Sequence, residues 1–346
     1  MRARPVRKRA PAWARFSDAQ LLRVRFRDLH LGQPRRPALR RAIRRLRDEL
    51  ASRDILLQPH VWFSDEWFSP DGVPGIAIPF YLAHPRLERL ERRMSRSIEG
   101  GNATGLMRIL RHEAGHAIDS AFRLRRRKIW REVFGSPTTR YPDRYRADPV
   151  SRAYVQHLDG WYAQAHPAED FAETFAVWLS PRSNWRVRYD ATPALTKLLA
   201  MDRMMRSVCG RRPAVRSADR IDPVAANDLT LREYYRRNLQ RRMHCDFSMI
   251  DAALRTGFSM TRPAGPRRRA DVALRALRGH LARHVVARTR IDRYGAEQLL
   301  QLAVERCRER KLWLRGDASA RRAAAEAMAR RLARAGLQGG GLQFTL

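Results

Sequence analysis

The sequence predicts an α+β protein in which a small mixed sheet and helices come first and an arginine-rich, all-helical region follows. Residues 55–64 and 75–82 are short runs rich in apolar and aromatic residues, which is typical of strands. Residues 103–124 and 167–180 repeat apolar residues at helical spacing. After residue 210 the apolar residues recur only at helical spacing, between many arginines. We therefore expect a sheet with an edge strand, packed on two long helices.

The remaining elements each have their own signal. Residues 36–53 carry one apolar stripe with arginines around it, which predicts a helix. The sequence Ser-Pro-Asp-Gly at 69–72 predicts a turn between the two strands. Pro79 cannot donate to a ladder, so the second strand is expected at a sheet edge or with a bulge. Further helices are expected at 192–208, 274–285, 296–314 and 318–335, with Gly336 ending the last one.

Length and composition suggest the domain organisation. A chain of 346 residues is long enough for about two domains. We expect a basic arm at 1–16, a mixed domain at 17–210 and a basic helical domain at 211–346. The sequence has neither an apolar run of membrane-spanning length nor the apolar stretch of a signal peptide. The chain has three cysteines, Cys209, Cys245 and Cys307, which are too few and too scattered for a disulfide framework. We therefore expect a cytoplasmic location.

The charge is strongly positive, with 70 basic against 35 acidic residues and a formal net charge of +35. Only four of the basic residues are lysines, and such a preference for arginine is typical of a GC-rich genome. Codon bias explains arginine in place of lysine, but it explains the shortage of acids less well. The other interpretation is a polyanionic partner, nucleic acid or an acidic polypeptide, bound through the N-terminal arm and residues 211–346.

The sequence His112-Glu113-Ala114-Gly115-His116 lies inside the predicted helix 103–124. Residues four apart share one helix face, so His112 and His116 can reach one zinc ion. Glu113 can then accept a proton from a zinc-bound water. The alternative is two solvated histidines on an ordinary helix. The small residues Ala114 and Gly115 would permit close packing behind the site.

A catalytic zinc of this kind needs a third protein ligand. The predicted helix 167–180 offers Glu169 and Glu173, again four residues apart on an otherwise apolar helix. One carboxylate can bind the metal and the other can accept the N–H of a ligating imidazole. By chemistry alone, the ligand could instead be Asp170, His166 or His157.

Asp119 lies three residues after His116 and seven after His112, on the same helix face. It is a candidate acceptor for an imidazole N–H, and the alternative is an acid on the helix surface.

These segments resemble a known family. HEAGHAID, YAQAHPAEDFAETFAVWL and the upstream HVWFSDEWFSPDGVPGIAIPFYLAHPRL are similar to the bacterial putative zinc-binding metallopeptidases of the gluzincin clan. The similarity to the catalytic domain of anthrax lethal factor is more distant. The resemblance covers roughly residues 50–205 and implies a zincin-like fold. It implies Glu169 as the third zinc ligand, Glu173 as support for a histidine and Tyr162 as a hydrogen-bond donor to the oxyanion.

The resemblance therefore implies a zinc-dependent metallopeptidase with one zinc ion per chain. A zinc-activated water would attack the peptide bond, with Glu113 as general base. Substrate would lie antiparallel to an edge strand, and the segment with Ile76, Ile78 and Phe80 is the candidate. Several arginines are expected near the cleft and would favour acidic substrates, because a guanidinium pairs with a carboxylate. The alternative is a solvated basic face. These arginines are Arg108, Arg111, Arg123, Arg125, Arg126 and Arg127.

Three other functions stay open from sequence. The chain could bind nucleic acid or another polyanion and keep a structural or degenerate zinc site. It could be a peptidase tethered to a polyanion through its basic segments. The same metal chemistry would also hydrolyse a non-peptide amide.

Overall fold

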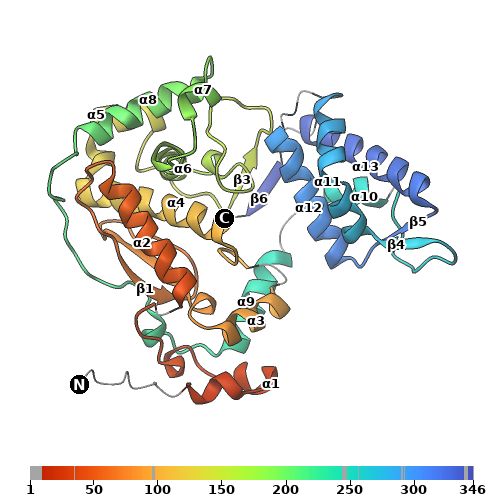
Figure 1. Cartoon of the computed structure of the whole chain (residues 1–346), viewed down its shortest axis with the longest axis horizontal. Coiled ribbons are helices and arrows are strands. Elements are labelled where there is room, and N and C mark those ends of the chain that lie inside the picture. Colours follow the sequence, from red (N-terminus) through yellow and green to blue (C-terminus); the bar gives the residue numbers. More distant parts are fainter. Residues whose placement is uncertain are drawn as a thin grey trace, which may run out of the picture. The chain divides into compact units, whose positions relative to one another are not determined.

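The computed structural model describes residues 10–34, 36–95, 98–243, 248–255, 257–289, 291, 293–338 and 342–345 (Figure 1). Its contacts divide the chain into two compact units. The first comprises Met1–Pro137, Phe171–Asp190 and Leu195–His244, and the second comprises Thr138–Asp170, Ala191–Ala194 and Cys245–Leu346. A unit of contacts is not a domain shown to fold by itself, so the domain boundaries at residues 16 and 210 stay predictions.

The four helices expected in the first 210 residues are present, with ends within two residues of those predicted. They are α2 (Pro37–Ala51), α4 (Ala103–Phe122), α6 (Pro167–Leu179) and α8 (Pro193–Arg206). The first unit also contains these helices: η1 (Ala12–Arg15), α1 (Asp18–Leu21), η2 (Arg27–Leu29), α3 (Pro85–Met94), η4 (Leu124–Arg126), α5 (Lys128–Phe134), α7 (Trp185–Arg188), η6 (Val224–Ala226) and α9 (Leu231–Met243).

The apolar stripe of α2 forms because leucine and isoleucine recur every three or four residues. Leu39, Leu46 and Leu50 are buried, and α2 packs along α4, as Figure 1 shows. Arg111 of α4 reaches Glu49 of α2 through two hydrogen bonds of 2.7 Å. The position of α4 is thus fixed both by apolar packing and by a buried ion pair.

The sheet of the first unit is smaller than expected. Strand β1 (His60–Ser64) pairs with β2 (Gly75–Pro79) in parallel, and within the described residues this sheet has only these two strands. The expected mixed pairing is limited to one antiparallel bridge, which joins Ala77 of β2 to Phe68 on the side away from β1. The predicted turn is present: the amide of Val73 donates to the carbonyl of Pro70, and Gly72 has a φ of 76°. That left-handed conformation favours glycine.

The second strand is shorter than the sequence suggested. Strand β2 ends at Pro79, and Phe80 begins the 3-10 helix η3 (Phe80–Leu82). Proline fixes its own φ near −65° and has no N–H to continue the ladder, which gives a physical reason for this end.

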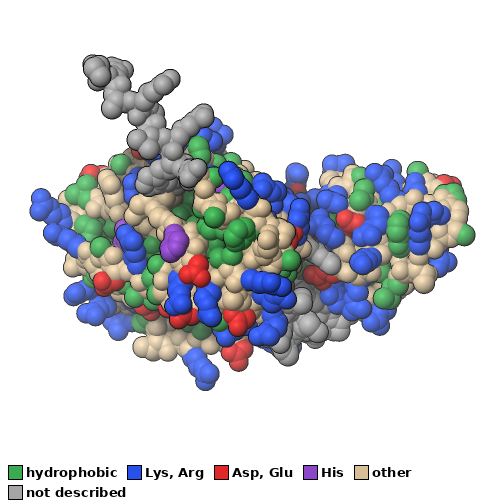
Figure 2. All heavy atoms as spheres, turned by 90° about the horizontal axis from the view of Figure 1, so that it is seen from below, with side chains coloured by type: hydrophobic (Ala, Val, Ile, Leu, Met, Phe, Trp, Pro, Cys, Tyr) green, Lys and Arg blue, Asp and Glu red, His purple; other side chains and the backbone are tan. Residues whose placement is uncertain are grey.

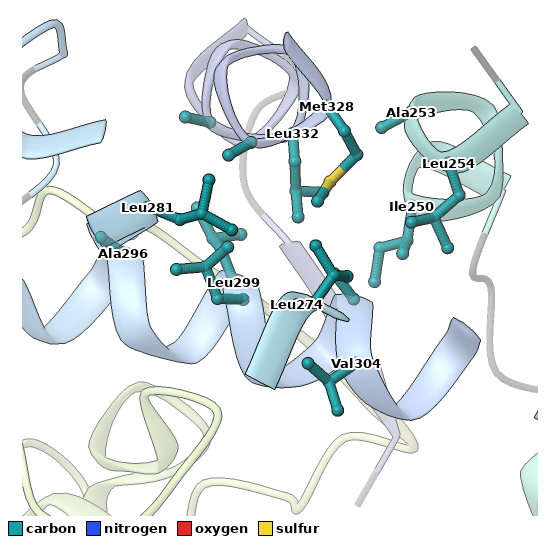
Figure 3. Close-up of a cluster of buried hydrophobic side chains, with 14 of the residues drawn as sticks. Ile250, Ala253, Leu254, Leu274, Leu281, Ala296, Leu299, Val304, Met328 and Leu332 are labelled. Carbon is teal, nitrogen blue, oxygen red and sulfur yellow. The ribbon is translucent and has the colours of Figure 1, made fainter. Parts of the chain in front are cut away.

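The second unit is built around four helices: α10 (Ser248–Arg255), α11 (Ala270–Val286), α12 (Arg293–Glu309) and α13 (Ala318–Gln338). Figure 3 shows their apolar side chains converging, with Leu274 and Leu281 of α11 facing Met328 and Leu332 of α13. Gly336 lies inside α13, so the expectation that it ends this helix is wrong.

The expectation of an all-helical region after residue 210 is wrong in detail. Strand β4 (Arg267–Arg269) pairs antiparallel with β5 (Trp313–Arg315). Strand β3 (Arg144–Ala147) pairs antiparallel with β6 (Leu342–Thr345). Each of these strands is three or four residues long and its partner is far away in sequence. A short window of sequence cannot reveal such pairing.

The basic arm expected at residues 1–16 lies partly outside the described residues, which begin at Ala10. Trp13 is buried, and its indole N–H donates to the carbonyl of Leu29 at 3.1 Å. The last residues of the expected arm are therefore packed on the first unit. Among the helices of the described residues, none is long and apolar enough to cross a membrane.

Candidate metal centre

Helix α4 places the HEAGH sequence at its centre. The helix begins after Asn102, whose side chain accepts a hydrogen bond of 2.8 Å from the amide of Gly105. It ends at Phe122, and the next residue, Arg123, adopts a left-handed conformation with φ 51°. His112 and Glu113 are both buried. Because the helix continues for nine residues before His112 and for six after His116, the backbone of the motif is held by regular helical hydrogen bonds.

Helix α6 crosses α4 at very short range. A Cβ atom added to Gly115 would lie 2.7 Å from the Cα atom of Ala172. That separation is too short for a real contact, so only glycine fits at this crossing. The expectation that the small residues of the motif permit close packing is thereby confirmed. The close approach brings the carboxylates of α6 next to the histidines of α4.

The two histidines are arranged as a pair of ligands would be. Nδ1 of His112 lies 2.8 Å from Oε1 of Glu173, which is fully buried. This carboxylate accepts the Nδ1–H, so the lone pair of His112 is on Nε2. Nε2 of His112 lies 3.2 Å from Nε2 of His116. Two nitrogens bound to a tetrahedral zinc at about 2.0–2.1 Å lie about 3.3 Å apart.

Glu169 completes the group. Ligand atoms of His112, His116 and Glu169 all lie within 4.8 Å of one another. Glu169 is 4% exposed and lies one turn before Glu173 on α6. A donor set of two imidazoles and one carboxylate is a set that zinc takes in catalytic sites. The residues therefore fit a zinc ion, and Glu173 is placed to hold the tautomer that a ligand needs.

Tyr141 is a member of the site that the sequence did not indicate. Its hydroxyl donates to Oε1 of Glu169 at 2.9 Å, and its ring stacks on His166 with centroids 3.7 Å apart. Tyr141 follows α5 in a proline-rich stretch without periodicity. Only the path of that loop brings the hydroxyl to the carboxylate, so no spacing rule could have found it.

Tyr162, the tyrosine indicated by the resemblance, lies in the 3-10 helix η5 (Tyr162–Gln164). Its ring packs edge-on against Tyr145 at 6.3 Å between centroids, beside the core of the second unit. Its place as oxyanion donor stays a prediction.

The alternative ligand His166 has another role. Its Nδ1 accepts a hydrogen bond of 3.1 Å from the amide of Ala168, and its Nε2 lies 2.9 Å from the carbonyl of Thr139. His166 therefore caps the first turn of α6 and ties it to the preceding loop. The group of candidate ligands with His112 and His116 contains neither His157 nor Asp170, although both are buried.

Asp119 is bonded to an arginine. It accepts hydrogen bonds of 2.8 Å from both the backbone amide and Nε of Arg125, which also pairs with Asp71 at 2.7 Å. Burial raises the pKa of Asp119, and the charge and hydrogen bonds of Arg125 offset this only in part. The observed role of Asp119 is to fasten the turn that follows α4. Its role as acceptor for an imidazole stays a prediction.

Two of the arginines expected near the cleft are used inside the fold. Arg111 is buried and pairs with Glu49. Arg125 is held by Asp119 and Asp71. A guanidinium already paired with a carboxylate has little left to offer an acidic substrate, so these two do not support an acidic preference.

The expected substrate strand is covered at its centre. Ala77 of β2 pairs with Trp62 on one side and forms an antiparallel bridge with Phe68 on the other. The side chains of Ile76 and Ile78 are fully buried, and so is Phe80, which lies outside the strand. A peptide could add to β2 only if the segment at Phe68 moved away, and substrate binding there stays a proposal.

Comparison with the curated proteins and with the solved structures gives no match. Comparison with protein-family models gives one, which begins in α3, ends in α8 and includes both helices of the site. Residues 88–199, which carry His112, His116, Glu169 and Glu173, match the model of the putative zinc-binding metallo-peptidase family.

Proposed function

We propose that the chain is a zinc-dependent peptidase whose zinc ion is held by His112, His116 and Glu169. The observation that carries the proposal is the convergence of these three side chains, with Nδ1 of His112 bonded to Glu173. The family match over residues 88–199 supports the same activity. A zinc ion bound there would polarise the scissile carbonyl and lower the pKa of water.

The protein's own groups then have distinct tasks. Glu113 takes a proton from the attacking water and passes it to the leaving amine nitrogen as the carbon–nitrogen bond breaks. Its position supports this assignment, because Glu113 is buried and directly follows the candidate ligand His112 on α4. Glu173 holds His112 in the tautomer with a free Nε2. Tyr141 holds Glu169, and Tyr162 is the candidate donor to the oxyanion.

The substrate is a peptide or a protein segment. Arg111 and Arg125 are paired with carboxylates of the protein itself, so a preference for acidic peptides would depend on the other arginines near the site. A library of peptides with acidic, neutral and basic residues at each position tests the preference. Equal cleavage of all three classes would reject it.

The test of the proposed function is the variant Glu113→Gln. We expect it to bind zinc as the wild type does and to hydrolyse peptides at least about 100-fold more slowly, because the general base is gone. Glu132→Gln is the matched control, since Glu132 is exposed on α5 and its ion pair within the described residues is with Lys128. Full hydrolysis by a zinc-loaded Glu113→Gln protein would reject the proposal.

Polyanion binding is a second candidate, favoured by the excess of 35 positive charges. Figure 2 shows lysine and arginine side chains spread over the visible face rather than gathered in one patch. A distributed charge supports weak, salt-dependent attraction more than a specific groove. Tight, salt-dependent binding of nucleic acid by a protein that hydrolyses no peptide would favour this function instead.

A further inference from the structure

A second group of metal-ligating side chains lies in the second unit, away from the HEAGH sequence. His280 and His284 are one turn apart on α11, and Glu326 lies on α13. Nε2 of His280 lies 2.5 Å from Oε1 of Glu326, and Nδ1 of His284 lies 3.8 Å from Oε2 of the same carboxylate. One ligand atom from each residue lies within 4.8 Å of the other two.

We propose that His280, His284 and Glu326 form a second metal site, which takes a divalent transition-metal ion such as Zn²⁺ and joins α11 to α13. The donor set is two imidazoles four residues apart on one helix and a carboxylate from a neighbouring helix. Imidazole nitrogen suits zinc and the later first-row metals, whereas magnesium and calcium prefer oxygen ligands. The three side chains come from one unit.

The surroundings of the group favour a site over an ordinary surface ion pair. His284 is 8% exposed, and its neighbours on α11, Leu281 and Val285, belong to the core around α10–α13. The side chains of His280 and Glu326 are 30% and 22% exposed, so the group opens to solvent on one side. An ion could enter from that side and keep water in its remaining positions.

Three arginines oppose a cation at this place. Arg330 donates to Nε2 of His284 at 2.7 Å, Arg288 lies 3.3 Å from Nδ1 of the same ring, and Arg322 contacts both His280 and Glu326. Their side chains are long and can swing away from the group. Because a guanidinium charge repels a metal ion and Arg330 occupies a ring nitrogen, Arg330→Gln is expected to raise the affinity for zinc.

The experiment counts metal in the full-length protein after removal and readdition of Zn²⁺. The wild type is expected to bind two equivalents, and the double variant His280→Ala/Glu326→Gln is expected to bind one. His116→Ala removes a ligand of the HEAGH site and is expected to leave one equivalent. His30→Asn is the matched control, because His30 is exposed, lies in neither group and has a φ of 48° that asparagine accepts.

The outcomes separate the two sites. One equivalent that is lost in His116→Ala and kept in the double variant would overturn the second site and support the first. One equivalent lost in the double variant and kept in His116→Ala would support the second site and contradict the zinc site of the proposed peptidase. Because a variant can lose metal by misfolding, helix content by circular dichroism is measured on each. Replacement of zinc by Co²⁺ adds visible d–d absorption, and the double variant is expected to lose the part of its intensity that the second ion contributes.

Discussion

Nδ1 of His112 donates to Oε1 of Glu173 across the crossing of α4 and α6, at a distance of 2.8 Å. The contact decides which nitrogen of the ring points at His116, whose Nε2 lies 3.2 Å from that of His112. A carboxylate on a different helix therefore sets the tautomer of the first candidate ligand. The orientation of the pair depends on tertiary packing as much as on the helix that carries it.

Glu173→Gln is expected to weaken zinc binding by about 10–100-fold, because the amide is a poorer acceptor for the imidazole N–H. A competition assay with a chromophoric chelator measures the affinity. Asp48→Asn, an exposed acid on α2, is the control and is expected to change nothing. Unchanged affinity in Glu173→Gln would mean that Glu173 does not orient the ligand.

Tyr141→Phe and Tyr162→Phe are expected to differ. Removing the hydroxyl of Tyr141 deletes its hydrogen bond to Glu169 and should lower zinc affinity by about 10-fold. Removing the hydroxyl of Tyr162 should leave zinc affinity unchanged and lower kcat by about 100-fold, if it supports the oxyanion. Zinc titration and steady-state kinetics on both variants separate the roles, and the reverse pattern would exchange the assignments.

Gly115→Ala is expected to destabilise the fold by about 1–3 kcal/mol, because the new methyl group would overlap Ala172. Gly105→Ala is the control on the same helix. Its Cβ would lie 3.5 Å from the nearest atoms of Asn102, so we expect stability to rise by up to about 1 kcal/mol. Urea unfolding measures both. Equal stability of the two variants would contradict the close crossing.

Arg111→Met is expected to destabilise the protein by about 3 kcal/mol, since it leaves Glu49 buried without its main partner. Arg45→Met removes the other partner of Glu49. The Arg45 side chain is 56% exposed, so the loss should stay below about 1 kcal/mol. Unfolding by urea at neutral pH compares them, and effects of equal size would show that burial does not matter here.

Asp251→Asn tests a pH dependence. Burial raises the pKa of Asp251, but hydrogen bonds and charge from Arg306 and Arg310 outweigh it and hold the pKa below its ordinary value. A carboxylate with a lowered folded pKa stabilises the fold above its unfolded pKa and loses this effect as pH falls through the folded value. The variant should be about 1 kcal/mol less stable than the wild type at pH 7. The difference should shrink below a pH of about 4, as measured by urea unfolding at each pH. A constant difference would exclude the ion pair as its cause.

Local patterns in the sequence were sufficient for the long helices α2, α4, α6 and α8, whereas α3, α5, α9 and α10 were not predicted. The apolar stripe of α2, the long apolar run of α6 and the turn at Gly72 each depend on neighbours within a few residues. The four-residue spacing of His112 and His116 likewise places both rings on one helix face. The four-residue spacing of Glu169 and Glu173 places both carboxylates on one face of α6. The glycine between the histidines indicated a close contact, and the structure has one with Ala172.

Tertiary structure decided everything that depends on residues far apart in the chain. The hydroxyl of Tyr141 reaches Glu169, and His280 reaches Glu326 across 46 residues. The sequence predicted that the strand with Ala77 lies at a sheet edge, but an antiparallel bridge from Phe68 pairs with Ala77 on that side. The short strands β3 and β6 form only as each other's partners. Periodicity records which face of an element is apolar, but it carries no information about which distant element covers that face, because that choice is made by packing of the whole fold.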